Sequence, residues 1–94
     1  ELVLRPDGSL DADARATIES LEEIAGPVVT VDEREDIDTL GGLVFSLAGR
    51  VPIRGELIRH ESGLEFEIID ADPRRIKRLR VRGFPPPRLS AAHP

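Results

Sequence analysis

Apolar residues recur along this chain with two periods, one typical of helices and one typical of strands. Four of them have the i, i+3, i+4, i+7 spacing of a single helix face: Leu40, Leu43, Val44 and Leu47. Asp38 or Thr39 is expected to cap this central helix at its start. Gly49 stands where a left-handed residue ends a helix. The pattern therefore predicts a helix from about residue 40 to residue 48.

The stretch before this helix is predicted to form a β-hairpin and then a shorter helix. Residues 1–5 are apolar enough for a strand, and residues 6–9 combine Pro, Asp and Gly as a turn does. Residues 10–16 alternate as a strand, although some of their apolar positions also continue a helical pattern. We place the change at Thr17, which is expected to cap a helix over residues 18–25.

Two segments near the middle of the chain are predicted to lack regular structure or to be only extended. Residues 28–31 are expected to be extended. Residues 32–38 are rich in Asp and Glu, and we expect them to form a solvated loop whose charges favour the positive end of the central helix. An acidic run of this composition does not match an EF-hand loop, so no metal site is predicted there.

After Gly55 the apolar residues alternate with polar ones, which predicts strands over residues 56–60, 64–70 and 74–82. We expect the last two of these strands to pair antiparallel, in the register that places apolar side chains opposite one another and carboxylates opposite arginines. That register pairs Phe66 with Leu79, Leu64 with Val81, Glu67 with Arg78, and Glu65 with Arg80. It also sets Ile68 against Lys77, which predicts a bulge or a change of face near Ile76.

The length of 94 residues suits a single small domain. The predicted class is α+β: a small two-layer α/β sandwich with a mainly antiparallel sheet and two helices. Phe45 and Phe66 are expected in its core. We assign residues 1–82 to the domain and expect residues 83–94, which are rich in proline, to be a disordered tail. The chain contains no methionine, so it is expected to be a segment of a longer protein.

The formal net charge of −5 conceals a strongly basic segment, because six of the nine residues from Arg74 to Arg82 are Arg or Lys. The acidic total argues against nucleic-acid binding. No apolar stretch approaches the roughly 20 residues of a membrane span, so direct membrane insertion is not expected. There is no cysteine, which excludes thiolate chemistry.

The basic segment has three interpretations. Its arginines can form a salt-bridged surface with the glutamates of the neighbouring strand, bind an anion or phosphate, or dock another protein. Gly41 and Gly42 also have two interpretations, since adjacent glycines in a first helical turn permit close approach of another backbone or expose N–H groups to a phosphate. Tight packing is the favoured one.

No catalytic or metal-binding constellation is predicted. The serines lack a nucleophile-elbow context or a suitable histidine base. His60 and His93 are isolated and have no companions at metal-ligand spacing. The sequence therefore predicts that the domain is not an enzyme and needs no cofactor.

Three blocks of sequence resemble a known family. They are DTLGGLVF at residues 38–45, PIRGE at residues 52–56 and RRI at residues 74–76, and the similarity extends over residues 2–82. Their order and spacing resemble the CorC/HlyC transporter-associated domain, the C-terminal module of hemolysin C-like and CorC-type magnesium and cobalt efflux proteins. The resemblance implies a small α/β sandwich similar to a subdomain of flavin-dependent (FAD-binding) dehydrogenases.

The resemblance also implies a function. In such parents the domain follows a transmembrane domain and a pair of CBS domains, and it modulates divalent cation transport. We therefore expect a non-catalytic cytoplasmic regulatory domain of a bacterial inner-membrane protein that contacts these partner domains. Alternatives are a sensor binding FAD or an adenine nucleotide at Gly41, Gly42, Arg74 and Arg75, and a plain interaction domain without a transport role. A homodimer is also left open.

Overall fold

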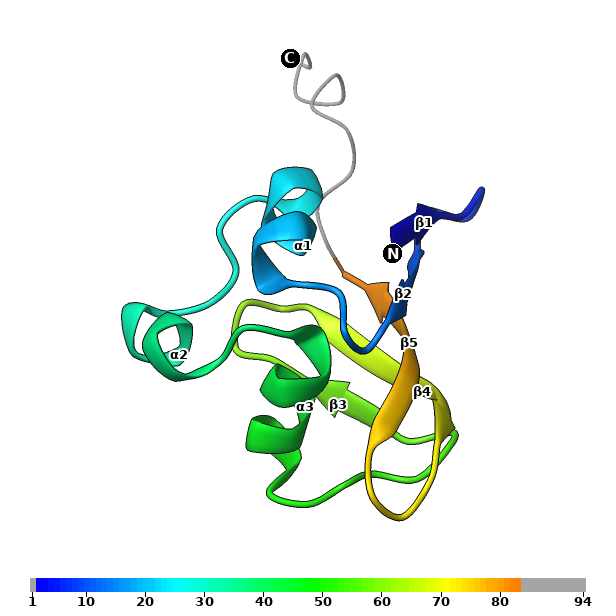
Figure 1. Cartoon of the computed structure of the whole chain (residues 1–94). Helices are drawn as coiled ribbons and strands as arrows, with labels where there is room; N and C mark the ends of the chain where they lie inside the picture. Colours follow the sequence, from blue (N-terminus) through cyan, green and yellow to red (C-terminus); the bar gives the residue numbers. More distant parts are fainter. Residues whose placement is uncertain (1, 84–94) are drawn as a thin grey trace.

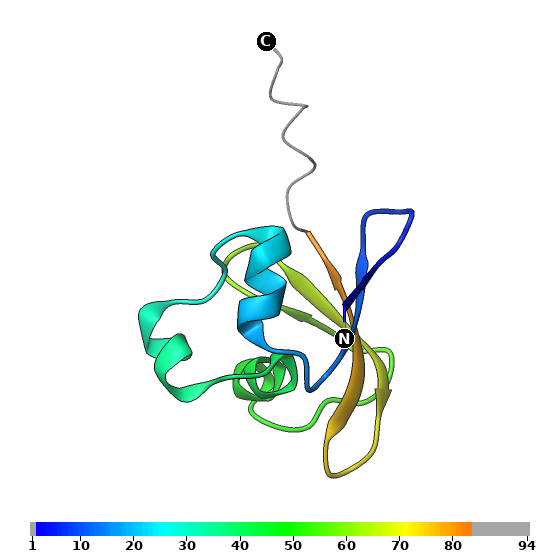
Figure 2. The ribbon, with the colours of Figure 1, turned by 45° about the horizontal axis from the view of Figure 1, so that its top comes forward.

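The computed structural model describes residues 2–83, which fold into one sheet and three helices. Helices α1, α2 and α3 lie on one side of the sheet, so the domain has two layers (Figures 1 and 2). The elements follow the chain as β1 Leu2–Leu4, β2 Leu10–Asp13, α1 Ile18–Ala25, α2 Val31–Asp36, α3 Leu40–Ala48, β3 Leu57–Arg59, β4 Glu65–Ala71 and β5 Ile76–Arg82. This arrangement confirms the predicted α+β class. The number of helices is three rather than two.

The sheet has the strand order β1-β2-β5-β4-β3, and each neighbouring pair is antiparallel. The predicted hairpin of β1 and β2 is confirmed, and β2 then pairs with β5 at the other end of the chain. Alternate residues of β2, β4 and β5 point toward the helices and are fully buried. The core therefore lies between the helical layer and one face of the sheet.

The predicted register of β4 against β5 is wrong by two residues. Phe66 pairs with Val81 and Ile68 pairs with Leu79. A shift of two residues leaves every side chain on its predicted face, so the hydrophobic pattern does not distinguish the two registers. The expected bulge is present: between the pairs Asp70–Arg78 and Ala71–Ile76, β5 has one extra residue, next to Ile76. A second irregularity lies on β4, between Ile68 and Asp70.

This register changes the ion pairs of the basic strand. Arg80 pairs with Asp11 of β2 at 2.8 Å, and Arg82 pairs with Glu67 at 2.9 Å. Glu65 pairs instead with Arg59 of the other neighbouring strand, at 3.1 Å. The predicted pairs Glu67–Arg78 and Glu65–Arg80 are therefore wrong. The salt-bridged surface itself is present, with different partners.

The acidic segment predicted to be a loop contains α2. Its N-cap is Thr30, whose hydroxyl accepts the N–H of Glu33 at 3.1 Å while the Glu33 carboxylate accepts the N–H of Thr30 at 3.0 Å. This reciprocal pair is a capping box, and the Thr-x-x-Glu spacing was the signal that the charge of the segment obscured. Arg34 then ties α2 to Glu22 of α1, at 2.7 Å.

The central helix α3 agrees with its prediction at both ends. Thr39 caps it through the N–H of Gly42 at 3.1 Å, and Gly49 ends it in the left-handed region at φ 75°. Its Leu40, Leu43 and Val44 are fully buried. Phe45 is the exception to the predicted core, because it lies on the outer side of the helix and is 51% exposed. The other predicted aromatic core residue, Phe66, is 0% exposed.

The start of α3 packs directly on the segment that follows β2. The N–H of Gly41 donates to the carbonyl of Ala14 at 2.9 Å. A Cβ added at Gly41 would lie 3.0 Å from the Cβ of Ala14 and 3.1 Å from its carbonyl oxygen. Close approach of another backbone therefore explains the first glycine of the pair, as the packing interpretation predicted.

We expect Gly41→Ala to lower the free energy of unfolding by about 1 kcal/mol. Overpacking costs about 1–3 kcal/mol, which exceeds the helix-propensity gain of up to about 1 kcal/mol. Gly42→Ala is the matched control, since its nearest atoms are side-chain atoms of Thr39 and Ile37 at 3.2 and 3.4 Å. Urea unfolding of the three proteins measures the difference. A Gly41→Ala protein more stable than the unsubstituted chain would contradict the packing role.

Candidate functional site

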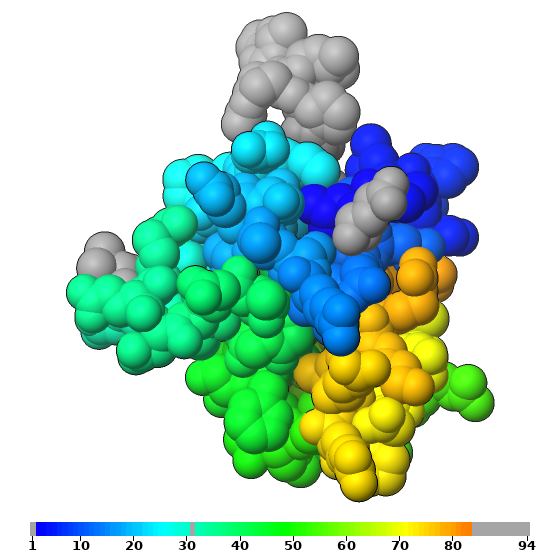
Figure 3. Space-filling view, viewed as in Figure 1, coloured from blue at the N-terminus to red at the C-terminus, as the bar shows by residue number. Residues whose placement is uncertain are grey.

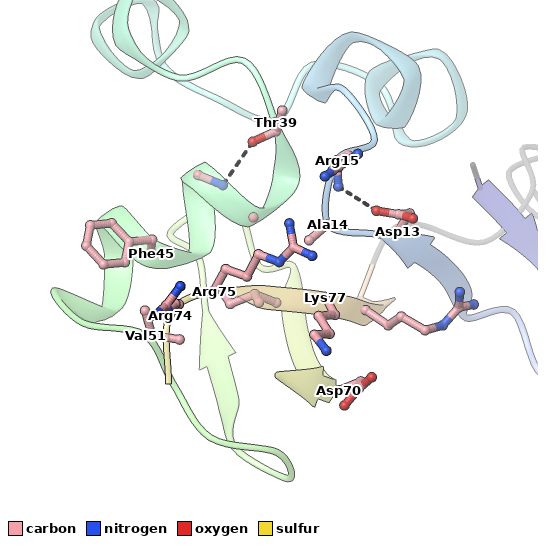
Figure 4. Close-up of a pocket in the computed structure, with 14 residues that line it drawn as sticks. Asp13, Ala14, Arg15, Thr39, Phe45, Val51, Asp70, Arg74, Arg75 and Lys77 are labelled. Atoms are coloured by element: carbon pink, nitrogen blue, oxygen red, sulfur yellow. Dashed lines mark hydrogen bonds between the residues drawn. The ribbon is translucent and has the colours of Figure 1, made fainter. Parts of the chain in front are cut away.

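A pocket of about 790 Å³ opens between the start of α3, the end of β2 and the hairpin that joins β4 to β5. In Figure 3 the β4–β5 hairpin, in yellow, lies next to α3, in green, at this place. The side chains that line the pocket are drawn in Figure 4. Its volume falls within the roughly 300–1,000 Å³ of typical small-molecule sites.

All four candidate site residues named from the sequence line this pocket: Gly41, Gly42, Arg74 and Arg75. The glycine pair and the arginine pair are about 30 positions apart in sequence, and the fold brings the two pairs together. Arg74 and Arg75 were predicted to begin the last strand, but they belong to the turn before β5. Ile76 is thus the first residue of the strand, so the side chains of the two arginines do not follow the alternation between the two faces of the sheet.

The glycines do not offer a phosphate-binding backbone. The N–H of Leu40 donates to the carbonyl of Ala16 at 2.9 Å, and the N–H of Gly41 donates to Ala14. The N–H of Gly42 donates to the hydroxyl of Thr39, as the dashed line in Figure 4 shows. Phosphate binding at a helix start depends on unsatisfied N–H groups. In this helix the first three are already engaged, so any anion in the pocket must be held by side chains.

The pocket is strongly basic although the chain is acidic. It is lined by five basic residues, Arg15, Arg74, Arg75, Lys77 and Arg78, and by two acidic ones, Asp13 and Asp70. Figure 4 shows both carboxylates on the side of the pocket away from Phe45. Five basic side chains around one opening raise its local potential well above that of the surrounding surface.

The arginines of the pocket are also the ones that the ion pairs leave out. Within residues 2–83, each of the other arginines except Arg54 lies within 4.0 Å of a carboxylate. The arginines without such a partner in this part of the chain are Arg15, Arg54, Arg74, Arg75 and Arg78. Four of these five line the pocket. Lys77 pairs with Asp72 at 3.7 Å, and Asp13 and Asp70 also line the pocket, so its positive charge is only partly compensated and is carried mainly by these four arginines.

A carboxylate outside the pocket fixes the turn that carries Arg74 and Arg75. One Asp72 oxygen accepts the N–H of Arg74 at 2.8 Å and that of Arg75 at 2.9 Å. These two bonds hold the pKa of Asp72 below its ordinary value. The main chains of the two arginines are thus fixed while their guanidinium groups remain available.

The opposite wall of the pocket is apolar and is held by an ion pair. Phe45 and Val51 form this wall, and Figure 4 shows Arg74 beside them. Val51 belongs to the loop after α3, where Arg50 makes a two-point contact with Glu56 at 2.8 and 2.7 Å. Glu56 also accepts the N–H of Ile53 at 2.7 Å, which closes the loop on itself.

A second polar cluster, which the sequence reading missed, lies at the β3–β4 turn. The Nδ1 atom of His60 is 2.7 Å from the hydroxyl of Ser62, and its Nε2 atom is 3.1 Å from the Glu33 carboxylate. Ser62 therefore has a histidine beside it, which the sequence pattern did not indicate. However, Nδ1 already accepts the main-chain N–H of Ser62 at 3.0 Å, so Nε2 carries the proton toward Glu33. The fully buried ring thus ties α2 to the turn and does not act as a base.

Among residues 2–83, no three His, Asp or Glu side chains are grouped as metal ligands would be. No helix in the same part of the chain has the length and apolar character needed to cross a membrane. Of the predicted tail, residues 83–94, only Gly83 is among the described residues, so this prediction and Phe84 lie outside them.

The fold and this pocket define a class: a small two-layer α+β domain with a five-stranded antiparallel sheet and a basic pocket at one end of the helical layer. The sequence profile of the family described as "Transporter associated domain" (CorC_HlyC) matches residues 4–84. The chain belongs to this family, which confirms the resemblance found from residues 38–45, 52–56 and 74–76.

Individual relatives agree with this assignment. Hemolysin C of Rickettsia prowazekii is 37% identical over 76 residues, which are 81% of this chain and 25% of that protein. A CorC_HlyC domain of a Xylella fastidiosa hemolysin, solved in complex with Mg²⁺ and Mn²⁺, is 33% identical, with a TM-score of 0.71 over 89% of this chain and 98% of that one. The corresponding domain of Nitrosomonas europaea is 27% identical, with a TM-score of 0.72 over 87% and 94%. The chain spans about a quarter of the length of the curated relatives it matches.

The loop that carries Val51 generates a pH prediction. Arg50, and then the N–H of Ile53, hold the pKa of Glu56 at about 2. Because this pKa lies below the ordinary value of 4.5 expected in the unfolded chain, the contribution of Glu56 to stability is complete above that value. It is lost as the pH falls toward about 2. Carboxyl-carbon NMR titration measures this pKa directly.

In the same titration, Arg50→Gln is expected to raise the pKa of Glu56 toward its ordinary value of 4.5, while the N–H of Ile53 keeps it somewhat lower. Arg54→Gln is the matched control, because Arg54 lies in the same loop and has no carboxylate partner among residues 2–83. An unchanged pKa in Arg50→Gln would show that the ion pair is absent in solution.

Proposed function

We propose that this domain is a non-catalytic regulatory module of a hemolysin C or CorC-type membrane protein, and that it modulates the transport of divalent cations such as magnesium and cobalt. The observation that carries the proposal is the family match across residues 4–84 together with the short span of the chain relative to its relatives. A module of this size in a longer protein acts through contacts with the rest of that protein.

The surface that we assign to such contacts is the loop between α3 and β3, residues 49–56. Ile53 in this loop is 70% exposed, although the Arg50–Glu56 pair and the N–H bond of Ile53 hold the loop in one conformation. Phe45, Leu47 and Leu57 beside this loop in sequence are exposed as well. Exposed apolar side chains on and beside a loop held by hydrogen bonds are typical of a protein contact.

The docking surface considered from the sequence was the basic strand face. There Arg80 and Arg82 of β5 are already paired with carboxylates of β2 and β4. Paired charges lose these partners on docking, so they favour association less than exposed apolar side chains do. We therefore assign docking to the loop of residues 49–56.

The partners in this proposal are the CBS-domain pair and the transmembrane domain of the parent, on the cytoplasmic side of a bacterial inner membrane. Residues 1–82 form the acting unit. If the loop binds one conformation of the partner domain more tightly than another, docking shifts the partner toward the conformation that it binds more tightly. A second copy of the domain is the competing occupant of the same surface, and a plain interaction role without transport is the competing function.

One observation favours the sensor alternative. The residues named for a nucleotide or FAD, Gly41, Gly42, Arg74 and Arg75, line a single pocket. A ligand-sensing role is compatible with regulation, since a regulatory domain responds to a signal.

The regulatory proposal is tested in the full-length parent protein by Mg²⁺ flux across vesicles containing it. Deletion of residues 2–82 is expected to change the flux at least about twofold, which corresponds to a modest coupling energy between this domain and the transmembrane domain. Ile53→Asp is expected to change it in the same direction, because a charge replaces an apolar contact.

Val3→Asp is the matched control, since Val3 is similarly exposed, at 53%, but lies on the edge strand β1. Ile53→Asp should leave the unfolding midpoint of the isolated domain nearly unchanged, whereas Val3→Asp faces Asp11 across the β1–β2 pair and should lower it slightly. If the flux is the same after the deletion, the transport role is wrong. If Val3→Asp matches Ile53→Asp, the loop is not the docking surface.

A further inference from the structure

We propose that the pocket binds a nucleotide, with the phosphates held by the side chains of Arg74, Arg75 and Arg78 and the ring placed against Phe45. This gives a chemical form to the sensor alternative above, and it stands whether or not the docking role does. It assigns the binding to side chains and not to the glycines of α3.

The first argument is the distribution of charge. Ion pairs neutralise most arginines of residues 2–83, but four of the five left without a carboxylate partner line one pocket. Like charges gathered in this way repel one another in the empty pocket, and an anion relieves the repulsion. A guanidinium presents two parallel N–H groups that match two phosphate oxygens. Phosphate is therefore the anion that these side chains fit best.

The second argument is the fixed position of the arginines. Asp72 holds the main chain of Arg74 and Arg75 by two hydrogen bonds, and Arg78 lies in β5 opposite Asp70. In Figure 4 Arg75 extends across the pocket toward Ala14, and Arg74 lies near Phe45. A site with a fixed backbone loses less freedom on binding than a mobile loop would.

The third argument concerns the kind of molecule that carries the phosphate. Of the two phenylalanines in residues 2–83, Phe66 is fully buried and Phe45 is half exposed at the pocket. Phe45 and Val51 form an apolar wall beside Arg74. A planar base stacks on an aromatic side chain, and an adjacent guanidinium stacks on either ring. A basic half next to an aromatic half fits a nucleotide better than it fits inorganic phosphate.

The fourth argument excludes the more usual mode of phosphate binding. The N–H groups of Leu40, Gly41 and Gly42 are engaged within the protein. A nucleotide held at this helix start would have to break those bonds. Substitution of a glycine is therefore expected to affect stability, and substitution of an arginine is expected to affect binding.

The test is a titration of the 94-residue chain with ADP, ATP, FAD and pyrophosphate, followed by amide chemical shifts and by calorimetry. Saturable shifts at residues 74–78 and at Phe45 are expected, with Kd for ADP below about 1 mM, which is typical of a weak specific site. ADP should bind more tightly than pyrophosphate, which has no ring. FAD binding tighter than ADP would identify the flavin dinucleotide as the source of the same phosphate chemistry.

Matched variants separate the parts of the site. Arg74→Gln with Arg75→Gln is expected to weaken ADP binding at least about tenfold, because two charge-assisted contacts are lost. Arg54→Gln is the control, since Arg54 is also unpaired within residues 2–83 but does not line the pocket. Phe45→Ala is expected to weaken ADP binding and to leave pyrophosphate binding unchanged.

Three results would overturn the proposal. The first is that no nucleotide gives a saturable shift at about 10 mM. The second is an equal loss of affinity in Arg54→Gln, and the third is that pyrophosphate binds as tightly as ADP and Phe45→Ala has no effect. The flux assay in the parent is independent of this titration. Loss of nucleotide binding with normal flux coupling would leave the docking role standing, and the reverse result would leave the pocket standing.

Discussion

The backbone contact between Gly41 and Ala14 places the helical layer on the sheet. At this point the N–H of Gly41 donates to the carbonyl of Ala14, and the next contact joins the N–H of Leu40 to Ala16. A short bridge between Thr17 and Thr39 continues the same seam. Because β2 pairs with β5, this seam also fixes α3 next to the start of β5 and the turn before it. The pocket exists because these three segments meet at one corner.

The charges of the domain are divided between two environments. On the open face of the sheet and around the loops, most arginines meet carboxylates, and exposed pairs of this kind add little to stability. At the corner of the pocket, one oxygen of Asp72 accepts the N–H groups of Arg74 and Arg75, and the other lies 3.7 Å from Lys77, so this carboxylate pairs with neither guanidinium group. The arginines of that turn therefore keep their charge uncompensated within the described chain. An acidic protein thus has one locally basic opening.

The pocket and the proposed docking surface share one loop. Val51 lines the pocket, and Ile53, two residues further along, is largely exposed to solvent. The Arg50–Glu56 pair closes the loop that contains both residues. In a regulatory domain, the surface that meets a partner and the site that meets a ligand must be energetically coupled. Here the two are joined by a single short loop with few free dihedral angles.

Local pattern by itself determined the helices α1 and α3, the alternating strands and the glycine pair that packs closely, because each depends on residues near one another in sequence. It missed α2, since an acidic run was weighed above the Thr30–Glu33 capping signal. It also named Gly41, Gly42, Arg74 and Arg75 as candidates for one ligand site, but it did not indicate that Phe45, Arg15 and Arg78 line the same pocket.

Only the tertiary structure decided the strand register, the ion-pair partners, the exposure of Phe45 and the gathering of unpaired arginines at the pocket. A two-residue slip keeps every side chain on its face, so periodicity cannot choose between registers. The partner of Arg80 lies 69 positions away on β2, and no local pattern specifies which distant strand becomes a neighbour. The sequence determines which side chains face inward. Their distant neighbours are set by how the elements pack together.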